Sequence, residues 1–452
     1  MIDTGALRKK ILKLAVTGNL SKQMDSDTPV SKELEVYVPA QLDIELEEIP
    51  DSWKYCKFDK VIINRDSERI PVSVADRKKL DKIYDYYGAS GVIDKVDKYL
   101  FDKDLLLIGE DGANLLSRST PIAFIARGKY WVNNHAHVLD ATEHILLEYA
   151  ALIINSMSLV PYVTGAAQPK LSQGMMNKIA LPVAPLEEQK RIVDTVKAAF
   201  EMLDQIDKLQ KQYSSDLEVL KSKIIDAGIQ GKLTEQLPED GTAEELLEQI
   251  VDCQNNMIKA GKIKKPKDIK NIDIEDIPFE IPNTWKWEKW GNIINVVSAR
   301  RVHQSDWRKE GIPFYRAREI AKLAVDGSVE NDLFISQELY DEFSIDRVPQ
   351  PGDLMVSAVG TLGKSYVVKD GDLFYYKDAS VLCFENYGGM NPYYLRYVMQ
   401  SSLMKNQIES NSGGTTVDTL TMVRMVQYIL PIPPLNEQDR IVRKINEILE
   451  IL

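Results

Sequence analysis

The feature that most constrains the fold of this chain is a long internal repeat. The segment "LPVAPLEEQKRIV" at 181–193 returns as "LPIPPLNEQDRIV" at 430–442. Likewise "EIPDSWKYCKF" at 48–58 returns as "EIPNTWKWEKW" at 280–290, and "LRKKILKLAVTGNLSKQ" at 7–23 matches "LKSKIIDAGIQGKLTEQ" at 220–236. Because each repeat distance is the size of a whole domain, the pattern indicates a duplicated domain rather than a solenoid of short repeats.

A heptad pattern follows the first copy of "EEQKRIV". From Ile192, apolar residues recur in alternating steps of four and three as far as Ala227, and Gln210 is the polar exception. This pattern predicts one long helix with a narrow apolar stripe that pairs with another helix, and the glycines at 228 and 231 mark its end. We expect helix pairing and partner docking to depend on Ile192, Val196, Leu203, Ile206, Leu220, Ile224, Ile441, Ile445 and Ile448.

The two ends of the chain carry the parts of a second such helix. Residues 7–14 match 220–227, and residues 441–452 repeat the phase of 192–203. The duplication is therefore cyclic, and the terminal helices are expected to pair with the central one. The predicted fold is α+β, with two mixed α/β domains in a pseudo-two-fold arrangement, joined by long antiparallel coiled-coil-like helices.

The repeat also suggests the domain boundaries. We expect an N-terminal half-helix and linker at 1–45, a first α/β domain at 46–185, a central spacer helix at 186–232, a linker with a short helix at 233–278, a second α/β domain at 279–434 and a short C-terminal half-helix at 435–452. The short helix of the linker opens with a capping box formed by Thr242 and Glu245.

Composition narrows the class of protein. No apolar run approaches the length of a membrane helix and no signal-peptide layout is visible, so a cytoplasmic protein is expected. Three scattered cysteines and four histidines predict neither a disulfide framework nor a metal site. The net charge of −12 argues mildly against a nucleic-acid partner. However, residues 61–180 hold 14 basic and 14 acidic side chains, and residues 284–429 hold 16 and 18, so each block has room for one basic face.

Taken together, these segments resemble the DNA-specificity subunit of type I restriction–modification systems. The resemblance runs the whole length and rests on the twin "PLxEQxRIV" openings, on the "IPxxWxW/Y" starts, and on "GEDGANLLSR", "WVNNHAHVL", "GIPFYRAREI" and "PGDLMVSAVGTLGK". It implies two domains that each recognise half of a split, asymmetric site in double-stranded DNA. It also implies helices that dock methyltransferase subunits, two in number, with restriction (motor-nuclease) subunits joining the complex. A stiff helix of about 60 Å suits this function, because half-sites lie at fixed axial spacings of about 34 Å per turn.

Two motifs suggest catalysis but have simpler explanations. "AVGTLGKS" at 358–365 fits a relaxed P-loop pattern, but the following "SYVVKDGDLFYY" predicts strand where a P-loop needs a helix. A hairpin that presents Thr361 and Lys364 is expected instead. "NPYY" at 391–394 resembles the tetrapeptide of DNA adenine methyltransferases, but Asn391 followed by Pro392 is typical of a helix start. No cofactor and no catalytic site are therefore expected. A stand-alone adenine methyltransferase and a coiled-coil protein adaptor are the alternatives.

Candidate DNA-binding residues in the first domain come from three segments. "WVNNHAHVL" at 131–139 is expected to form one strand with its polar side chains on one face, where Asn and His offer donors and acceptors to base edges or phosphates. Basic residues nearby offer phosphate contacts, and so does the loop "GAAQPK" at 165–170. The candidates are Asn133, His135, His137, Arg118, Arg127, Lys129, Gln168 and Lys170.

In the second domain, the most basic stretch is 298–320, where Trp307 and Tyr315 are interleaved with Lys and Arg, as suits a duplex-binding face. The loop "SGGTT" at 412–416 matches 165–170 and has backbone amides that could approach phosphate. The candidates are Arg300, Arg301, His303, Arg316, Arg318, Thr361, Lys364, Ser412 and Thr415. Alternatively, each of these residues belongs to an ordinary solvated surface or turn.

Overall fold

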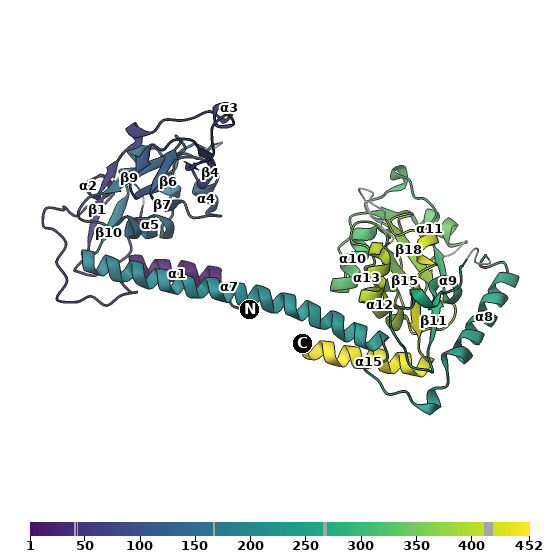
Figure 1. Ribbon diagram of the computed structural model, residues 1–452. Coiled ribbons are helices and arrows are strands. Elements are labelled where there is room, and N and C mark those ends of the chain that lie inside the picture. Colours follow the sequence, from purple (N-terminus) through teal and green to yellow (C-terminus); the bar gives the residue numbers. More distant parts are fainter. Residues whose placement is uncertain (40–41, 43, 166–167, 265–268, 346–347, 411–418) are drawn as a thin grey trace. The chain divides into compact units, whose positions relative to one another are not determined.

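The computed structural model describes residues 1–39, 42, 44–165, 168–264, 269–345, 348–410 and 419–452 (Figure 1). They form two compact units, Met1–Gln212 and Tyr213–Leu452, each with its own hydrophobic core. Helix α7 (Leu186–Ile229) is continuous and contributes to both units, so a long helix links the two domains. Within the described ranges, no helix is both long and apolar enough to cross a membrane.

The first unit mixes short strands with helices. In chain order it contains α1 (Thr4–Val16), β1 (Lys54–Lys57), α2 (Phe58–Val61), β2 (Ile62–Asn64), α3 (Val74–Arg77), β3 (Tyr84–Gly88), β4 (Gly91–Val96), β5 (Phe101–Asp102), β6 (Leu105–Gly109), α4 (Asn114–Ser117), β7 (Ala123–Ala126), β8 (Lys129–Val132), β9 (Ala136–Ala141), α5 (Leu147–Ser156), α6 (Gln173–Met176), β10 (Ala180–Val183) and the start of α7.

The second unit follows a similar order with insertions. After the end of α7 it contains α8 (Ala243–Lys259), β11 (Lys286–Lys289), α9 (Trp290–Ile293), β12 (Asn295–Val297), β13 (Ile312–Tyr315), α10 (Ala317–Asp326), β14 (Phe334–Ile335), α11 (Gln337–Ser344), β15 (Leu354–Ser357), β16 (Ser365–Val367), β17 (Tyr375–Tyr376), β18 (Val381–Glu385), α12 (Pro392–Gln400), α13 (Ser402–Ser410), α14 (Met422–Met425), β19 (Ile429–Ile432) and α15 (Leu435–Ile451).

A common framework explains why the sequence repeats. Strands β1 and β10 pair antiparallel with Lys54 opposite Val183, and β11 and β19 pair with Lys286 opposite Ile432. Each unit also has an antiparallel central sheet, in the order β2-β9-β6-β7 or β12-β18-β15-β16. The inner strands β6 and β15 are buried along their whole length. Helices α10 and α12 contact β15, whereas β6 has α5 on one face and strands β5 and β8 on the other. The sheet and the strand pair therefore form the shared core.

The units differ outside this framework. The first carries a second sheet in the order β4-β3-β8-β5, in which β3 and β8 are parallel. The second instead carries β14-β13-β17 together with α10 and α11. The helix α8 is also an addition of the second unit, and Leu246 and Ile250 on one of its faces enter the core. The mixed α+β character predicted from the sequence is confirmed.

Helices α1 and α15 each lie along the part of α7 that belongs to their own unit (Figure 1). In the first unit, Arg8 on α1 donates to Asp204 at 2.7 Å and its guanidinium lies over the ring of Phe200. In the second unit, Ile441 and Ile445 pack beside Gly228. The long central helix, its end near residue 229 and its pairing with terminal helices are confirmed.

One strand prediction is wrong. The segment 131–139 is not a single strand, because β8 ends at Val132 and β9 begins at Ala136, and the two lie in different sheets. The side chain of Asn133 accepts a hydrogen bond from the backbone N–H of His135 at 2.8 Å. Such an Asx turn reverses the direction of the chain locally. The alternation of polar residues across 133–137 therefore reflects a turn between two strands.

Candidate nucleic-acid interface

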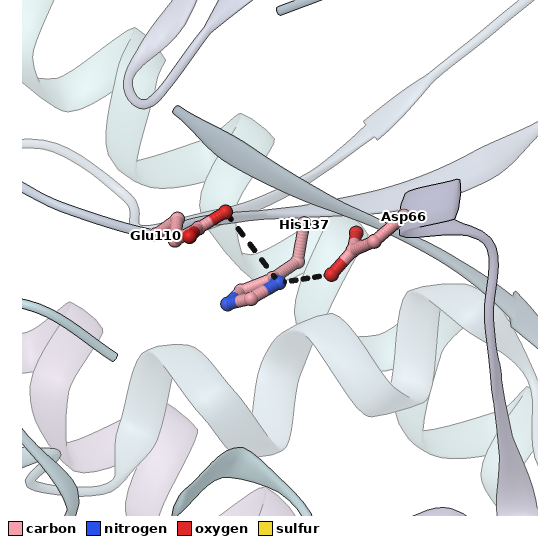
Figure 2. Close-up of side chains that lie close together, drawn as sticks. All are labelled: Asp66, Glu110 and His137. Carbon is pink, nitrogen blue, oxygen red and sulfur yellow. Dashed lines mark hydrogen bonds and ion pairs between the residues drawn. The ribbon is translucent and has the colours of Figure 1, made fainter. Parts of the chain in front are cut away.

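A buried histidine in the first unit joins two of the predicted DNA-contact segments. Nδ1 of His137, on β9, lies 2.6 Å from Oδ2 of Asp66 (Figure 2). Its Nε2 lies 2.7 Å from the carbonyl oxygen of Leu171. Because a carbonyl oxygen only accepts, Nε2 donates to it. His137 thus anchors the chain that follows the loop at 165–170 to the central sheet.

Glu110 extends this cluster at the end of β6. Its carboxylate accepts from Arg69 at 2.7 Å and pairs with Lys170 at 3.0 Å, and it lies 3.9 Å from Nδ1 of His137. Burial raises the pKa of Glu110, but hydrogen bonds from Arg69 and Lys170 outweigh burial and hold it below its ordinary value. Burial likewise raises the pKa of Asp66, and the hydrogen bond and charge of His137 bring it below its ordinary value.

The cluster also offers a ligand set for a metal ion. Ligand atoms of Asp66, Glu110 and His137 all lie within 4.8 Å of one another. As arranged, however, both nitrogens of His137 are engaged with acceptors, and Arg69 and Lys170 neutralise the Glu110 carboxylate. A metal would have to displace these cations, so the geometry fits an internal salt-bridge network better than a metal centre.

Other predicted residues lie close to this cluster. Asn133 is buried in its turn, whereas His135 is half-exposed with Nδ1 2.8 Å from a carboxylate oxygen of Asp111. Lys170 pairs with Thr164 through backbone hydrogen bonds, and Gln168 is exposed in the loop between them. The structure therefore brings the two predicted segments together around the end of β6.

The remaining basic candidates of the first unit lie elsewhere. Arg118 donates to the carbonyl oxygens of Ile154 and Met157 at the end of α5, and burial lowers its pKa. Arg127 forms ion pairs with Asp104 and Glu148, and its side chain is more than half exposed. Lys129 lies over the ring of Tyr99, 3.8 Å from Asp102. Arg118 thus stabilises a helix end, while Arg127 and Lys129 remain accessible.

Sequence reasoning missed three cations beside the cluster. Arg65 and Lys103 both contact the buried carboxylate of Asp140, and Arg69 contacts Glu110. The two arginines had a signal in "RDSER" at 65–69, which follows strand β2 directly, whereas Lys103 had none. Interpretation of this signal required the distant carboxylates that only the fold brings near.

In the second unit, Arg316 and Arg318 share two carboxylates. Both donate to Glu319, which is fully buried, and both reach the exposed side chain of Asp332. Burial raises the pKa of Glu319, but the hydrogen bonds from the two arginines outweigh burial and lower the pKa to about 2. These arginines therefore stay charged and fixed at the start of α10.

The other basic candidates of this unit are held more loosely. Arg300 pairs with Glu342 at 3.0 Å, and its guanidinium lies over the ring of Phe343. Arg301 lies 3.6 Å from Asp378 with 74% of its side chain exposed. His303 is exposed at the start of a short turn. Arg301 is thus the most accessible of the paired arginines among the candidates.

The P-loop alternative fails on geometry. Strands β15 and β16 pair antiparallel, and the residues between them form a tight loop with Gly360 and Gly363 at positive φ. Thr361 and Lys364 are exposed on this loop, as predicted, and no helix begins at the lysine. The loop also bridges to Thr419 through Val359. Ser412 and Thr415 lie outside the described residues.

The "NPYY" segment is structural too. The side chain of Asn391 accepts from the backbone N–H groups of Tyr393 and Tyr394 and caps α12, as predicted. Tyr394 is buried and its hydroxyl donates to the carbonyl oxygen of Pro431 at 2.8 Å, just as Tyr149 donates to Pro182 at 3.0 Å. An aromatic ring in that position cannot clamp a flipped base.

The predicted helix-pairing residues fall into two groups. Most of them are buried, whereas Ile206 on α7 and Ile448 on α15 are partly covered and Leu220 is 43% exposed. The apolar stripe is also exposed at Tyr213, and Leu209 beside the stripe is exposed as well. The fully buried or nearly buried members are Ile192, Val196, Leu203, Ile224, Ile441 and Ile445.

The repeated letters "EQxR" form a joint between the long helices and the domains. Glu188 is buried and accepts hydrogen bonds from Trp53 Nε1 at 2.8 Å and from Ser21 and Gln23. Glu437 accepts from Trp285 Nε1 at 2.8 Å and from Thr234 and Gln236. These matched contacts link three repeated segments, and they explain why all three recur together.

The neighbouring letters act in the same way. Gln189 and Gln438 are buried, and each accepts a backbone N–H that lies just before the helix α5 or α12. Arg191 pairs with Asp27, and Arg440 pairs with Asp240. The repeat is visible in the sequence, but the role of these residues in the joint is not.

Comparison with known proteins agrees with this architecture. A family model described as the type I restriction modification DNA specificity domain matches the chain twice, over residues 50–213 and 282–451. A Haemophilus influenzae protein that bears the name of a type I restriction enzyme specificity subunit is 27% identical over 362 residues, which are 79% of this chain and 78% of that protein. The EcoAI specificity subunit of Escherichia coli is 27% identical over 246 residues, which are 52% of this chain and 40% of that protein.

A solved structure shows the same fold. A chain from a structure of the type I R-M system, described with respect to complex assembly and conformational transition, superposes with a TM-score of 0.57 at 15% identity. The match covers 90% of this chain and 92% of that chain. At this level of identity the likeness concerns the fold alone.

Proposed function

Because the chain belongs to the family of type I restriction–modification DNA specificity proteins, we propose that it is the DNA-specificity subunit of such a complex. In this role it recognises a split, asymmetric DNA site and recruits the subunits that act on DNA, without performing catalysis itself. The observation that carries the proposal is one framework that occurs twice with two different outer layers. One framework attaches both domains to one helix, and the unlike outer layers recognise unlike half-sites.

We further propose that the recognition domains comprise residues 46–185 and 279–434 and that an internal two-fold relates them. The helices at 186–232 and 435–452 and the half-helix within 1–45 would serve as the spacer and the docking surface for two methyltransferase subunits, which restriction subunits join. DNA contacts would come from the exposed candidates, chiefly Arg127, Lys129, His135, Gln168 and Lys170 in the first unit and Arg300, Arg301, His303, Arg318, Thr361 and Lys364 in the second.

Mapping of N6-methyladenine in the host genome, with and without this gene, tests the proposal. We expect deletion to remove one bipartite motif with two unlike halves, and complementation to restore it. Retention of every methylated motif would contradict the proposal. Incubation of the purified chain with DNA and labelled S-adenosylmethionine gives a second test, in which methyl transfer by the chain alone would support the methyltransferase alternative. Partner binding without any DNA binding would support the adaptor alternative.

A further inference from the structure

Two arginines of the second unit have their inner edges fixed by one buried carboxylate. Glu319 is the third residue of α10 and accepts from Nε, NH2 and the backbone N–H of Arg316, and from Nε of Arg318, at 2.8–3.0 Å. The buried side chain of Ile320 follows it and packs against the central sheet. Because Glu319 is buried on a packed helix, the two guanidinium groups are held in defined orientations.

The outer N–H groups of the same arginines converge on a second carboxylate, which is exposed. NH2 of Arg316 lies 2.8 Å from Oδ1 of Asp332, and NH2 of Arg318 lies 3.3 Å from both of its carboxylate oxygens. The side chain of Asp332 is 65% exposed and that of Arg318 is 61% exposed. The carboxylate of Asp332 thus bridges the guanidinium groups of Arg316 and Arg318 at the surface. A phosphate group could be bound in the same geometry.

The local charge explains what this carboxylate does. Two guanidinium groups and two carboxylates sum to zero, so this part of the most basic stretch of the chain presents little positive field to DNA while Asp332 is in place. Glu319 cannot be displaced, because it is buried and saturated with donors. Asp332 can be displaced, because an exposed ion pair contributes little to stability.

We propose that Asp332 is an internal competitor of DNA phosphate: it occupies the outer edges of Arg316 and Arg318 in the free protein, and a backbone phosphate replaces it in the DNA complex. This inference rests on the proposed function. It assigns the two arginines to phosphate binding rather than to base recognition. It also makes Asp332 a residue that sets affinity and salt dependence for all DNA sequences.

The test uses the full chain reconstituted with its methyltransferase subunits. Binding is measured over a range of salt concentrations to a duplex that carries the mapped motif and to a scrambled duplex of equal composition. Asp332→Asn should tighten binding to both duplexes about three- to tenfold at low salt, and it should steepen the slope of log K against log salt by about one. Glu330→Gln is the matched control, because it removes one negative charge two positions away and, among the described residues, forms no ion pair with either arginine.

The outcomes separate the hypotheses. The competitor role is supported if Asp332→Asn raises DNA affinity more than Glu330→Gln does, and if this gain in affinity shrinks when Arg318→Ala is added. A gain equal to that of Glu330→Gln, or one that Arg318→Ala leaves unchanged, overturns it in favour of a general charge effect. Weaker binding by Asp332→Asn also overturns it, since Asp332 would then be a positioning residue. If the unaltered complex binds neither duplex, the proposed function itself fails; specific binding with an unresponsive Asp332 removes only this inference.

Discussion

The carboxylates that hold the basic side chains differ between the two units, although the joints with the long helices match. In the first unit, Glu110 accepts a hydrogen bond from Arg69, 41 positions away in the chain, and Asp66 contacts His137, 71 positions away, as well as Arg69 three positions on. In the second unit, Glu319 contacts arginines one and three positions before it. The candidate surface of the first unit thus depends on tertiary structure, whereas a central part of the second is organised by one helix start.

This difference shows how a duplicated domain can diverge. The framework must keep the Trp–Glu joint and the antiparallel strand pairs, because they attach the domain to α7. The outer layers have no such constraint, so they carry different sheets and different ion-pair networks. Breaking the shared part should therefore affect both units alike, and breaking the outer part should affect only one.

The largest effect is expected at the joint. Glu188→Ala removes the acceptor of Trp53 Nε1 and two further donors and leaves a cavity, so it should lower the free energy of unfolding by about 4 kcal/mol. Glu437→Ala should cost about the same in the second unit. Urea unfolding monitored by tryptophan fluorescence measures both losses. Lys190→Ala, at an exposed position two residues further along α7, should cost less than about 0.5 kcal/mol. A large loss at one position only would show that the two joints are not equivalent.

The next largest effect is the acid dependence of stability that Glu319 gives to the second unit. The pKa of Glu319 is lowered to about 2 from its ordinary value of 4.5, so its ionisation stabilises the folded second unit above pH 4.5. That contribution, on the order of 3 kcal/mol, is lost as the pH falls from about 4.5 towards 2. Urea melts of Glu319→Gln should therefore show a flatter acid dependence than the unaltered protein. Glu330→Gln should keep the original dependence; the same flattening in both variants would disprove the assignment to Glu319.

The sequence predicted features that depend on short-range patterns. The heptad stripe predicted the long helix, and the predicted helix caps at Thr242 and Asn391 are confirmed. The turn at Asn133 was mistaken for strand, because alternation of polar residues occurs in both. The partners of His137 and Glu110 could not be predicted, since they come from separate strands and loops that only the folded sheet brings together.

A smaller effect is expected for recognition in the second half-site. Arg301 is largely exposed and loosely paired, so it is free to reach a base edge. Arg301→Ala should relax preference in one half of the mapped motif and cost about 1–3 kcal/mol there. Arg318→Ala, at a phosphate contact, should weaken binding to all duplexes alike and reduce the salt slope by about one. Binding to a library of half-site variants measures both; a uniform loss for Arg301→Ala would assign it to phosphate as well.

The finest comparison concerns a single methyl group between the long helices. The repeat aligns Ala15 with Gly228 and Val196 with Ile445. The first unit therefore pairs alanine with valine at the positions where the second unit pairs glycine with isoleucine. A Cβ added at Gly228 would lie 2.7 Å from Cδ1 of Ile445, which is the atom that valine lacks. Ile445→Val alone should cost about 1 kcal/mol through the cavity that it leaves. Gly228→Ala alone should change stability little, because the gain in helix propensity offsets the clash.

Together, the two substitutions recreate in the second unit the residue pair of the first. The double variant should therefore be at least as stable as the unaltered protein, with a coupling free energy of about 1–2 kcal/mol between the two sites. A double-mutant cycle of urea unfolding measures that coupling. Additive effects would mean that the helices adjust their separation when the methyl group moves. The match between the two helix pairs would then lie in their hydrogen-bonded joints and not in the packing of their apolar stripes.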